Sequence, residues 1–380
     1  MEELRIIHTA DVHLGAPFEF LGARGAQQRL ALREALERVV AAARDEGCGA
    51  IVIAGDLFNS AYDVLESDMT FAIGALAGAG PGCTVVILPG SHDFYSAGSV
   101  YERERARFEA AGNVKLLTPR SQVVEIPELS LAIHGKALTS NAGVEGALSG
   151  LTPVERCRWN VAVAHGSVEG FGGVPESADV PVGLDGLQPG FSYVALGHWH
   201  SYRVVREGCP SVVYCGSPEV IARDQRGAGT AVSIAFGPEG VRTNLVRAGK
   251  RRLAQASIDC TGLGATEDLV RKVSASVPED RDLILDLELT GVIGAESVVD
   301  PAEALDALEG RYFSVRLAGK GPSRAISREE LLLVPDDTVA GKFVRVMLSR
   351  MESASEDKKG LYEEALQVGY QLFKGRNPLG

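Results

Sequence analysis

Side chains that can bind metal ions lie at or just after the ends of five short apolar runs in this sequence of 380 residues. The runs read RIIHTAD, AIVIAGD, TVVILPG, NVAVAHG and YVALGHWH. The side chains are those of Asp11, His13, Asp56, His92, Asp93, His165, His198 and His200. Each histidine alone is more often a packing residue than a ligand, because short motifs often match by chance. Five of the seven histidines follow these runs, however, and independent core histidines have no reason to do so. Together they predict one metal site.

The types of ligand indicate which ions and which chemistry fit. Imidazole and carboxylate groups without a thiolate suit Mn, Fe, Zn or Ni better than a soft copper or iron–sulfur site. The donors are more than one ion needs. Two ions about 3.5 to 4 Å apart, bridged by one carboxylate, would use them all, and Asp56 is the natural bridge. Such a pair holds the attacking and leaving oxygens of a phosphoryl displacement, so the pattern favours that chemistry.

The elements that must position these side chains can be read from the same runs. Short apolar runs are typical of buried strands, and the clearest helix between them spans residues 26–46 and stops at Gly47. Alternating strands and helices predict a layered α/β domain, in which ligands bind outside the carboxyl ends of the strands. Residues far apart in the sequence would then meet in one crevice. His8 and His134 lie inside apolar segments and are assigned to packing.

The pattern changes near residue 250, which predicts three parts. Residues 1–250 form the motif-rich α/β domain, and residues 251–335 mix helix-like and strand-like stretches, as in a small α+β domain. Residues 336–380 contain two amphipathic helices joined by the polar stretch ESASEDKK. Their apolar stripes fit either a partner surface or packing against their own domain.

Composition restricts the class of protein. A net charge of −12, from 38 Lys and Arg against 50 Asp and Glu, excludes a protein that coats nucleic acid through bulk positive charge. The start MEELRIIHTADVHLG has no feature of a signal peptide, and we expect a cytoplasmic protein that does not bind a membrane. The six cysteines form no Cys-x-x-Cys pair, so inert thiols are expected.

The motifs resemble those of a known family. DVH at 11–13, GD at 55–56, GSHD at 90–93, His165 and GHWH at 197–200 resemble the five motifs of calcineurin-like metallophosphoesterases. IHTADVHLG, GDLFN, YVALGHWH and YCGSPEV are similar to the SbcD-type DNA repair nucleases of that superfamily. The resemblance covers about residues 4–240. It implies the metallophosphoesterase fold, a β-sandwich flanked by helices, with a capping domain at 251–335 and C-terminal helices at 336–380.

The resemblance also implies residue roles. One metal ion would be held by Asp11, His13, Asp56 and His200, and the other by Asp56, the residue at position 91, His165 and His198. Two Mn ions are favoured, with Fe, Zn or Ni as alternatives. His92 would contact the phosphate and give a proton to the leaving oxygen, while Asp93 orients and charges the His92 ring. A carboxylate beside an imidazole fixes its tautomer and raises its pKa, which agrees with that role.

Position 91 departs from the family, which has asparagine where this chain has Ser91. A serine hydroxyl lies nearer its own backbone than an asparagine carbonyl oxygen does. We therefore expect that Ser91 does not reach the ion directly and that the second ion binds weakly, through its three other ligands.

The leading interpretation is a two-metal phosphodiesterase that cleaves DNA, as the nuclease subunit of a DNA repair complex. The partners implied by the resemblance are DNA, an SMC-like ABC ATPase of the SbcC type that binds the C-terminal helices, and a second copy in a homodimer. Exonuclease and endonuclease activity both stay open. Two alternatives also remain: a phosphodiesterase for nucleotides or other small molecules, and a weakly active structural subunit that regulates an SMC-like ATPase.

Overall fold

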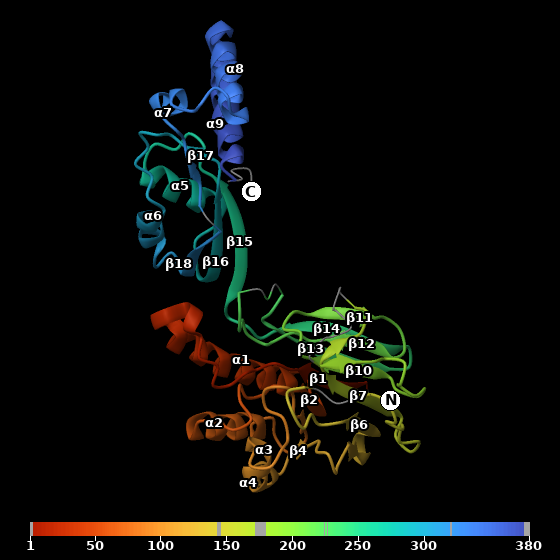
Figure 1. Ribbon diagram of the computed structural model, residues 1–380. Coiled ribbons are helices and arrows are strands. Elements are labelled where there is room, and N and C mark those ends of the chain that lie inside the picture. Colours follow the sequence, from red (N-terminus) through yellow and green to blue (C-terminus); the bar gives the residue numbers. More distant parts are fainter. Residues whose placement is uncertain are drawn as a thin grey trace. The chain divides into compact units, whose positions relative to one another are not determined.

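The computed structural model describes residues 3–142, 146–171, 180–223, 225, 227–319 and 321–375. The first two residues of the predicted α/β domain and the last five of the predicted C-terminal segment lie outside the described residues. The chain divides into two compact units, Met1–Arg252 and Leu253–Gly380, which Figure 1 colours from red to green and from green to blue.

Two six-stranded sheets build the first unit. The first sheet has the order β14-β13-β1-β2-β3-β4. Its strands are β1 (Leu4–Thr9), β2 (Ala50–Ala54), β3 (Thr84–Leu88), β4 (Val114–Leu116), β13 (Thr230–Gly237) and β14 (Gly240–Arg247). The second has the order β11-β12-β10-β7-β6-β5. Its strands are β5 (Val123–Ile126), β6 (Leu131–Gly135), β7 (Trp159–His165), β10 (Tyr193–Gly197), β11 (Arg203–Arg206) and β12 (Ser211–Tyr214).

Alternate residues of the central strands face two different cores, because successive side chains of a strand point to opposite faces. Ile6 and Val52 pack with Val163 of the other sheet, in the core between the sheets. Their neighbours Ile7 and Ile51 face a second core that the helices cover. The result is a mixed α/β fold with two sheets flanked by helices, which confirms the predicted fold class.

Short connections and helices complete the first unit. The helices are α1 (Gly25–Asp45), α2 (Glu66–Ala77), α3 (Val100–Arg103) and α4 (Arg105–Ala110), with 3-10 helices η1 (Glu19–Arg24) and η2 (Pro127–Leu129). A two-stranded pair is formed by β8 (Ser167–Val168) and β9 (Pro181–Val182). Helix α1 agrees with the predicted helix to within one residue at each end. The parallel strands β1, β2 and β3 end at the same edge, where the first three motifs follow them.

The second unit contains a three-stranded sheet of order β15-β16-β18. Its strands are β15 (Arg252–Asp259), β16 (Asp280–Thr290) and β18 (Tyr312–Ala318), and a separate pair is β17 (Val292–Ile293) and β19 (Ser323–Arg324). Its helices are α5 (Thr266–Ser276), α6 (Pro301–Leu308), α7 (Arg328–Leu332), α8 (Val339–Ser353) and α9 (Glu356–Phe373). In the described part of both units, no helix is long and apolar enough to cross a membrane.

Helices α8 and α9 lie side by side (Figure 1) and bury one face of their hairpin within the second unit. Val344 and Leu366 pack against Leu331 of α7. The Gln367 side chain donates a hydrogen bond to the Ile326 carbonyl and accepts one from the Ile326 amide. Other apolar side chains stay exposed, so the hairpin combines packing against its own unit with an uncovered face.

Candidate metal centre

The loops after β1 and β2 bring the first carboxylates together. The backbone amide of Asp11 donates to the Gly55 carbonyl at 3.0 Å, and that of His13 donates to the Asp56 carbonyl at 2.9 Å. Asp11, His13 and Asp56 have left-handed backbone angles, with φ of 54°, 51° and 53°. Residues other than glycine rarely adopt this region, and they cluster at functional sites when they do. The loop geometry therefore marks this edge of the sheet as a candidate site.

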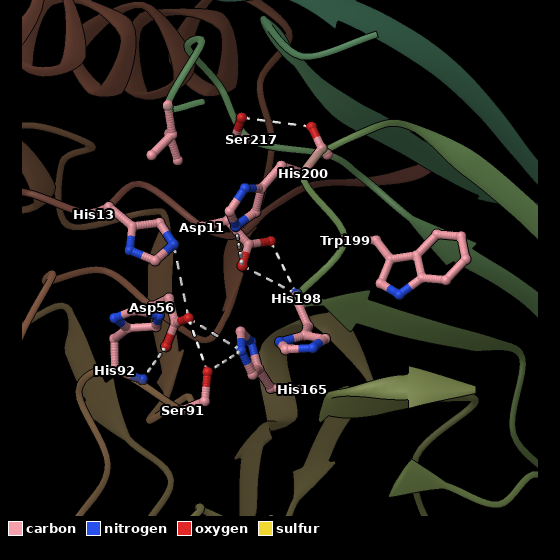
Figure 2. Close-up of polar contacts among 12 residues, drawn as sticks. Asp11, His13, Asp56, Ser91, His92, His165, His198, Trp199, His200 and Ser217 are labelled. Atoms are coloured by element: carbon pink, nitrogen blue, oxygen red, sulfur yellow. Dashed lines mark hydrogen bonds and ion pairs between the residues drawn. The ribbon is translucent and has the colours of Figure 1, made fainter. Parts of the chain in front are cut away.

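Asp56 lies at the centre of the cluster (Figure 2). Its Oδ2 is 3.2 Å from His165 Nε2 and 3.7 Å from His13 Nε2. Its Oδ1 accepts a hydrogen bond of 2.8 Å from the His92 backbone amide. The side chain is 2% exposed, so this carboxylate is buried between two imidazoles.

Ser91 also points into the cluster. Ser91 Oγ lies 3.2 Å from Asp56 Oδ2 and 3.2 Å from His165 Nε2. Asp56 Oδ2 and His165 Nε2 also lie 3.2 Å apart, so the three atoms form a nearly equilateral triangle. Two ligands of one ion, each with a bond of about 2.0 to 2.2 Å, lie about 3.0 to 3.5 Å apart. The buried turn after β3 thus brings the hydroxyl as close to Asp56 and His165 as two ligands of one ion lie to each other.

The second sheet contributes its residues from the ends of β7 and β10. His165 Nδ1 lies 2.9 Å from the Ala54 carbonyl oxygen, to which it can donate, and this leaves Nε2 facing Asp56. The His198 backbone amide donates to both Asp11 carboxylate oxygens at 3.0 Å. His200 Nε2 lies 3.8 Å from Asp11 Oδ1, and its Nδ1 contacts the Gln225 side chain.

Three groups of candidate ligands within the described residues have atoms within 4.8 Å of one another. They are Asp11 with His13 and His200, His13 with Asp56 and His92, and Asp11 with Asp56 and His165. His198 belongs to none of them; its ring packs edge-on against His165, with centroids 5.2 Å apart. Buried His13 Nε2 has no hydrogen-bond partner among the described residues, as expected of a ligand atom. The residues present therefore fit divalent metal ions, which the resemblance implies.

Burial and mutual charge set the pKa values in the cluster. Burial lowers the pKa of His13 and of His198 to about 4, so both rings are neutral at pH 7. Burial alone would lower the pKa of His165, but the Asp56 charge and hydrogen bond raise it to about 9. Burial raises the pKa of Asp11 to about 7. Burial would also raise the pKa of Asp56, but His165 and His13 hold it below its usual range. An ion bound at His165 Nε2 would displace the ring proton and supply the positive charge that faces Asp56.

The predicted contact between Asp93 and the His92 ring is wrong. The Asp93 carboxylate is fully buried and accepts hydrogen bonds from the amides of Asp56, Phe58 and Gly90 and from the Tyr101 hydroxyl. The His92 ring is not among its donors in the described residues. It instead has Nδ1 3.4 Å from the Asn59 carbonyl oxygen, and its centroid is 4.8 Å from that of His13. Adjacent residues in a turn point in different directions. The Asp93 carboxylate links the loop of Asp56 and Phe58 to the loop of Gly90.

Two glycines are required by close approach of the loops. A Cβ on Gly90 would lie 2.3 Å from Asp56 Oδ1, and one on Gly197 would lie 1.9 Å from the Ala54 carbonyl oxygen. Both distances are far below van der Waals contact. The glycines in the motifs thus let three loops meet at Asp56 and His165.

Sequence patterns did not identify the residues that contact the predicted site residues and hold them in position. Tyr101 donates a hydrogen bond of 2.6 Å to Asp93 and is fully buried. Asn59 and Gln225 contact His92 and His200, as described above. Asn59 and Tyr101 lie close in sequence to the second and third motifs, which is the one signal that could have suggested them.

Comparison with known families gives a match over the same region. A family model described as calcineurin-like phosphoesterase matches residues 4–202. This range includes every residue of the candidate centre that the motifs predicted.

Curated relatives are similar at modest identity. The Escherichia coli (strain K12) protein named as the SbcD subunit of the nuclease SbcCD is 27% identical over 59% of this chain and 62% of its own length. The Bacillus subtilis (strain 168) protein of the same name is 24% identical over 62% of this chain and 67% of its own length. The Haloferax volcanii protein named DNA double-strand break repair protein Mre11 is 26% identical over 91% of this chain and 75% of its own length. The chain thus spans less than two thirds of the Escherichia coli relative. Among solved structures, the protein TT1561 of Thermus thermophilus aligns with 65% of this chain and all of its own length, at 15% identity and a TM-score of 0.41.

Proposed function

Because the chain belongs to the calcineurin-like phosphoesterase family, we propose that it is a metal-dependent phosphodiesterase that cleaves DNA as the nuclease subunit of a repair complex. The observation that carries the proposal is the position of Asp56, whose Oδ2 faces His13 on one side and His165 with Ser91 on the other. A carboxylate so placed suits the bridging position of a two-metal site. The nuclease assignment is supported by the relatives named as SbcCD nuclease subunits and as Mre11.

In this proposal the ligands divide into two sets, with Mn as the favoured ion. Asp11, His13 and His200 would hold one ion, and Ser91, His165 and His198 the other, with Asp56 shared. When bound, divalent ions supply Lewis acidity and a lowered pKa for water. His198 is assigned to the second set because the family resemblance implies it. In the structure the His198 backbone amide, and not its ring, makes the polar contact to Asp11.

The chain itself supplies substrate contacts and a proton. His92 is exposed beside the buried cluster, with its ring edge-on to His13. We place the substrate phosphate between this ring and Asp56, so that His92 can donate a proton to the leaving oxygen. Asp93 does not touch the ring, and we assign it to holding the loops that carry Asp56 and His92.

We further propose that the first unit is the catalytic domain, that residues 251–335 form the capping domain, and that residues 336–380 bind an SbcC-type SMC-like ATPase. The support for the partner surface is the exposed face of α8 and α9, where Val346 is 52% and Leu361 66% exposed. A homodimer and a cytoplasmic location belong to the same proposal. Six free cysteines fit a reducing compartment.

A second candidate is a phosphodiesterase for nucleotides or other small phosphoesters, which the net charge of −12 favours because DNA is itself strongly negative. A weakly active subunit that regulates an ATPase is the third.

One assay separates the three. Purified protein is given labelled single-stranded DNA or bis-(p-nitrophenyl) phosphate, with Mn or with a chelator, beside Asp56→Ala prepared in the same way. DNA cleavage that chelator and Asp56→Ala both abolish supports the nuclease. Turnover of the small ester alone supports the second candidate. Failure to hydrolyse either substrate with Mn would contradict both enzymatic proposals.

A further inference from the structure

A pocket opens directly beside the candidate centre. Its volume is about 680 Å³, and its lining includes Ser91, His92 and His198 on the side of the metal centre. Tyr62 and Phe94 lie on another part of its wall. Small-molecule sites usually have volumes of about 300 to 1,000 Å³, so the pocket could hold one substituent of a bound phosphodiester.

The described wall of this pocket is polar and partly aromatic. Among the described residues that line it, none is Lys, Arg, Asp or Glu. Asn59, Ser60 and Asn141 supply neutral polar groups. A pocket for further phosphates of a polyanion would need cationic side chains. This one instead suits a neutral, flat group with hydrogen-bonding edges.

The aromatic pair is held in place by the loops that form the centre. Tyr62 and Phe94 pack edge to face, with centroids 5.8 Å apart and planes at 81°. The Tyr62 hydroxyl lies 2.8 Å from Ser96 Oγ. Phe94 follows Asp93, whose carboxylate is fixed by four hydrogen bonds. Tyr62 is nevertheless 48% exposed, which leaves ring surface uncovered. An exposed but anchored aromatic ring beside a reactive centre is a stacking surface.

We propose that this pocket binds the nucleobase next to the scissile phosphate, by stacking on Tyr62, which Phe94 supports from its edge. This proposal rests on the proposed function, because it places a phosphodiester at the neighbouring centre. It makes the substrate class a nucleic-acid strand with an unpaired base at the point of cleavage, since a base within a duplex is already stacked on its neighbours. Stacking recognises every base, so we expect no strong sequence preference.

The test uses single-stranded DNA of ten thymidines and a second strand in which one central residue is abasic. With the wild-type protein and Mn, the abasic residue should slow cleavage at one of its two flanking bonds by roughly 5- to 150-fold, the range that alanine substitutions give for one stacked base. Tyr62→Ala should slow cleavage of the intact strand by a similar factor and should no longer distinguish the two strands. Tyr62→Phe should behave like the wild type, because it keeps the ring and removes the hydroxyl.

Two controls keep the result interpretable. Leu65→Ala changes an exposed apolar residue (67% exposed) on the same loop that does not line the pocket, and it should leave both strands unaffected. The number of Mn ions bound per chain should be the same in wild type and Tyr62→Ala, which shows that the centre is intact.

The outcomes separate the two proposals. The base pocket is wrong, while the nuclease proposal stands, if the wild-type protein cleaves both strands equally at every bond. The same holds if Tyr62→Ala still cleaves the bonds beside the abasic residue more slowly than those of the intact strand. If the wild-type protein cleaves neither strand, the nuclease proposal fails, and the base pocket fails with it.

Discussion

At the scale of single residues, Asp56 and His92 occupy different positions in the candidate centre. Asp56 is buried between imidazoles, whereas His92 is exposed at its rim. The first position suits a ligand and the second suits a proton donor. These roles make different predictions for the same measurement.

His92→Ala should keep bound Mn but lose turnover of DNA by ~10²- to 10⁴-fold, the usual contribution of a general acid. Mn per chain is measured by elemental analysis after gel filtration, and turnover by the DNA assay. The structure places His92 within 4.8 Å of His13 and Asp56, so a ligand role is the direct competitor. Loss of Mn from this variant would show that His92 is a ligand.

Ser91 yields a second prediction at this scale. Because its hydroxyl lies 3.2 Å from both Asp56 and His165, we expect it to contribute to the second ion, unlike the expectation from sequence. Ser91→Ala should raise the Mn concentration for half-maximal activity by roughly 10- to 100-fold. Ser91→Asn should stay within a few-fold of the wild type. Direct Mn binding by calorimetry gives the same comparison without activity. Superimposed titrations of Ser91→Ala and wild type would contradict a role for the hydroxyl.

At the scale of elements, the strand ends could be predicted from sequence, but the directions of side chains in the loops could not. Apolar runs followed by Gly, Asp or His place the ligands at one edge, because parallel strands share their carboxyl ends. Asp93 was misassigned because adjacency along the chain does not reveal that its carboxylate turns toward Tyr101 and the loop amides. Tyr62 and Phe94 meet across 32 positions of sequence, which only the packed loops determine.

Gly90 offers a test of loop packing. Gly90→Ala places a methyl group 2.3 Å from Asp56 Oδ1, so the loop must shift. We expect a loss of about 1 to 3 kcal/mol in unfolding free energy, as for overpacked cores, together with weaker Mn binding. The matched control is Gly74→Ala in α2, which has open space around it and should be neutral or slightly stabilising. Thermal unfolding and Mn titration measure both effects. A Gly90→Ala protein as stable as Gly74→Ala would show that the loops are not tightly packed.

His8 in β1 predicts how stability depends on pH. Burial lowers the pKa of His8 to about 3, below its value of 6.5 in the unfolded chain. The unfolded state therefore binds the extra proton first, and folding stability falls as pH decreases from 6.5 toward 3. The expected loss from this residue is about 1.5 to 2 kcal/mol between pH 6.5 and 5. Urea unfolding in chelator should show a smaller loss of stability with falling pH in His8→Gln than in wild type, by about this amount, because His13 and His198 contribute equally in both proteins. Equal slopes would mean that His8 does not titrate as its burial implies.

At the scale of the whole molecule, the two units allow catalysis and partner binding to be tested separately. Val346→Glu with Leu361→Glu places charges on the exposed face of the hairpin, away from its buried face. We expect binding to a co-expressed SbcC-type ATPase to weaken by at least about 30-fold, the effect of losing one hot spot. Hydrolysis of the small ester should not change.

The control for this variant is Leu245→Glu, an exposed position of β14 in the first unit. Co-purification is measured for all three proteins. Undiminished binding by the hairpin variant would place the partner surface elsewhere.

If the buried Asp56 carboxylate joins two ion sites, the number of Mn ions bound per chain depends on it. The wild-type protein, equilibrated with excess Mn and separated from free ion by gel filtration, should carry two Mn per chain. Asp56→Ala should carry none, because both sites lose the ligand that they share. A wild-type protein with one Mn or fewer, or an Asp56→Ala protein that keeps two, would show that Asp56 does not bridge two ions.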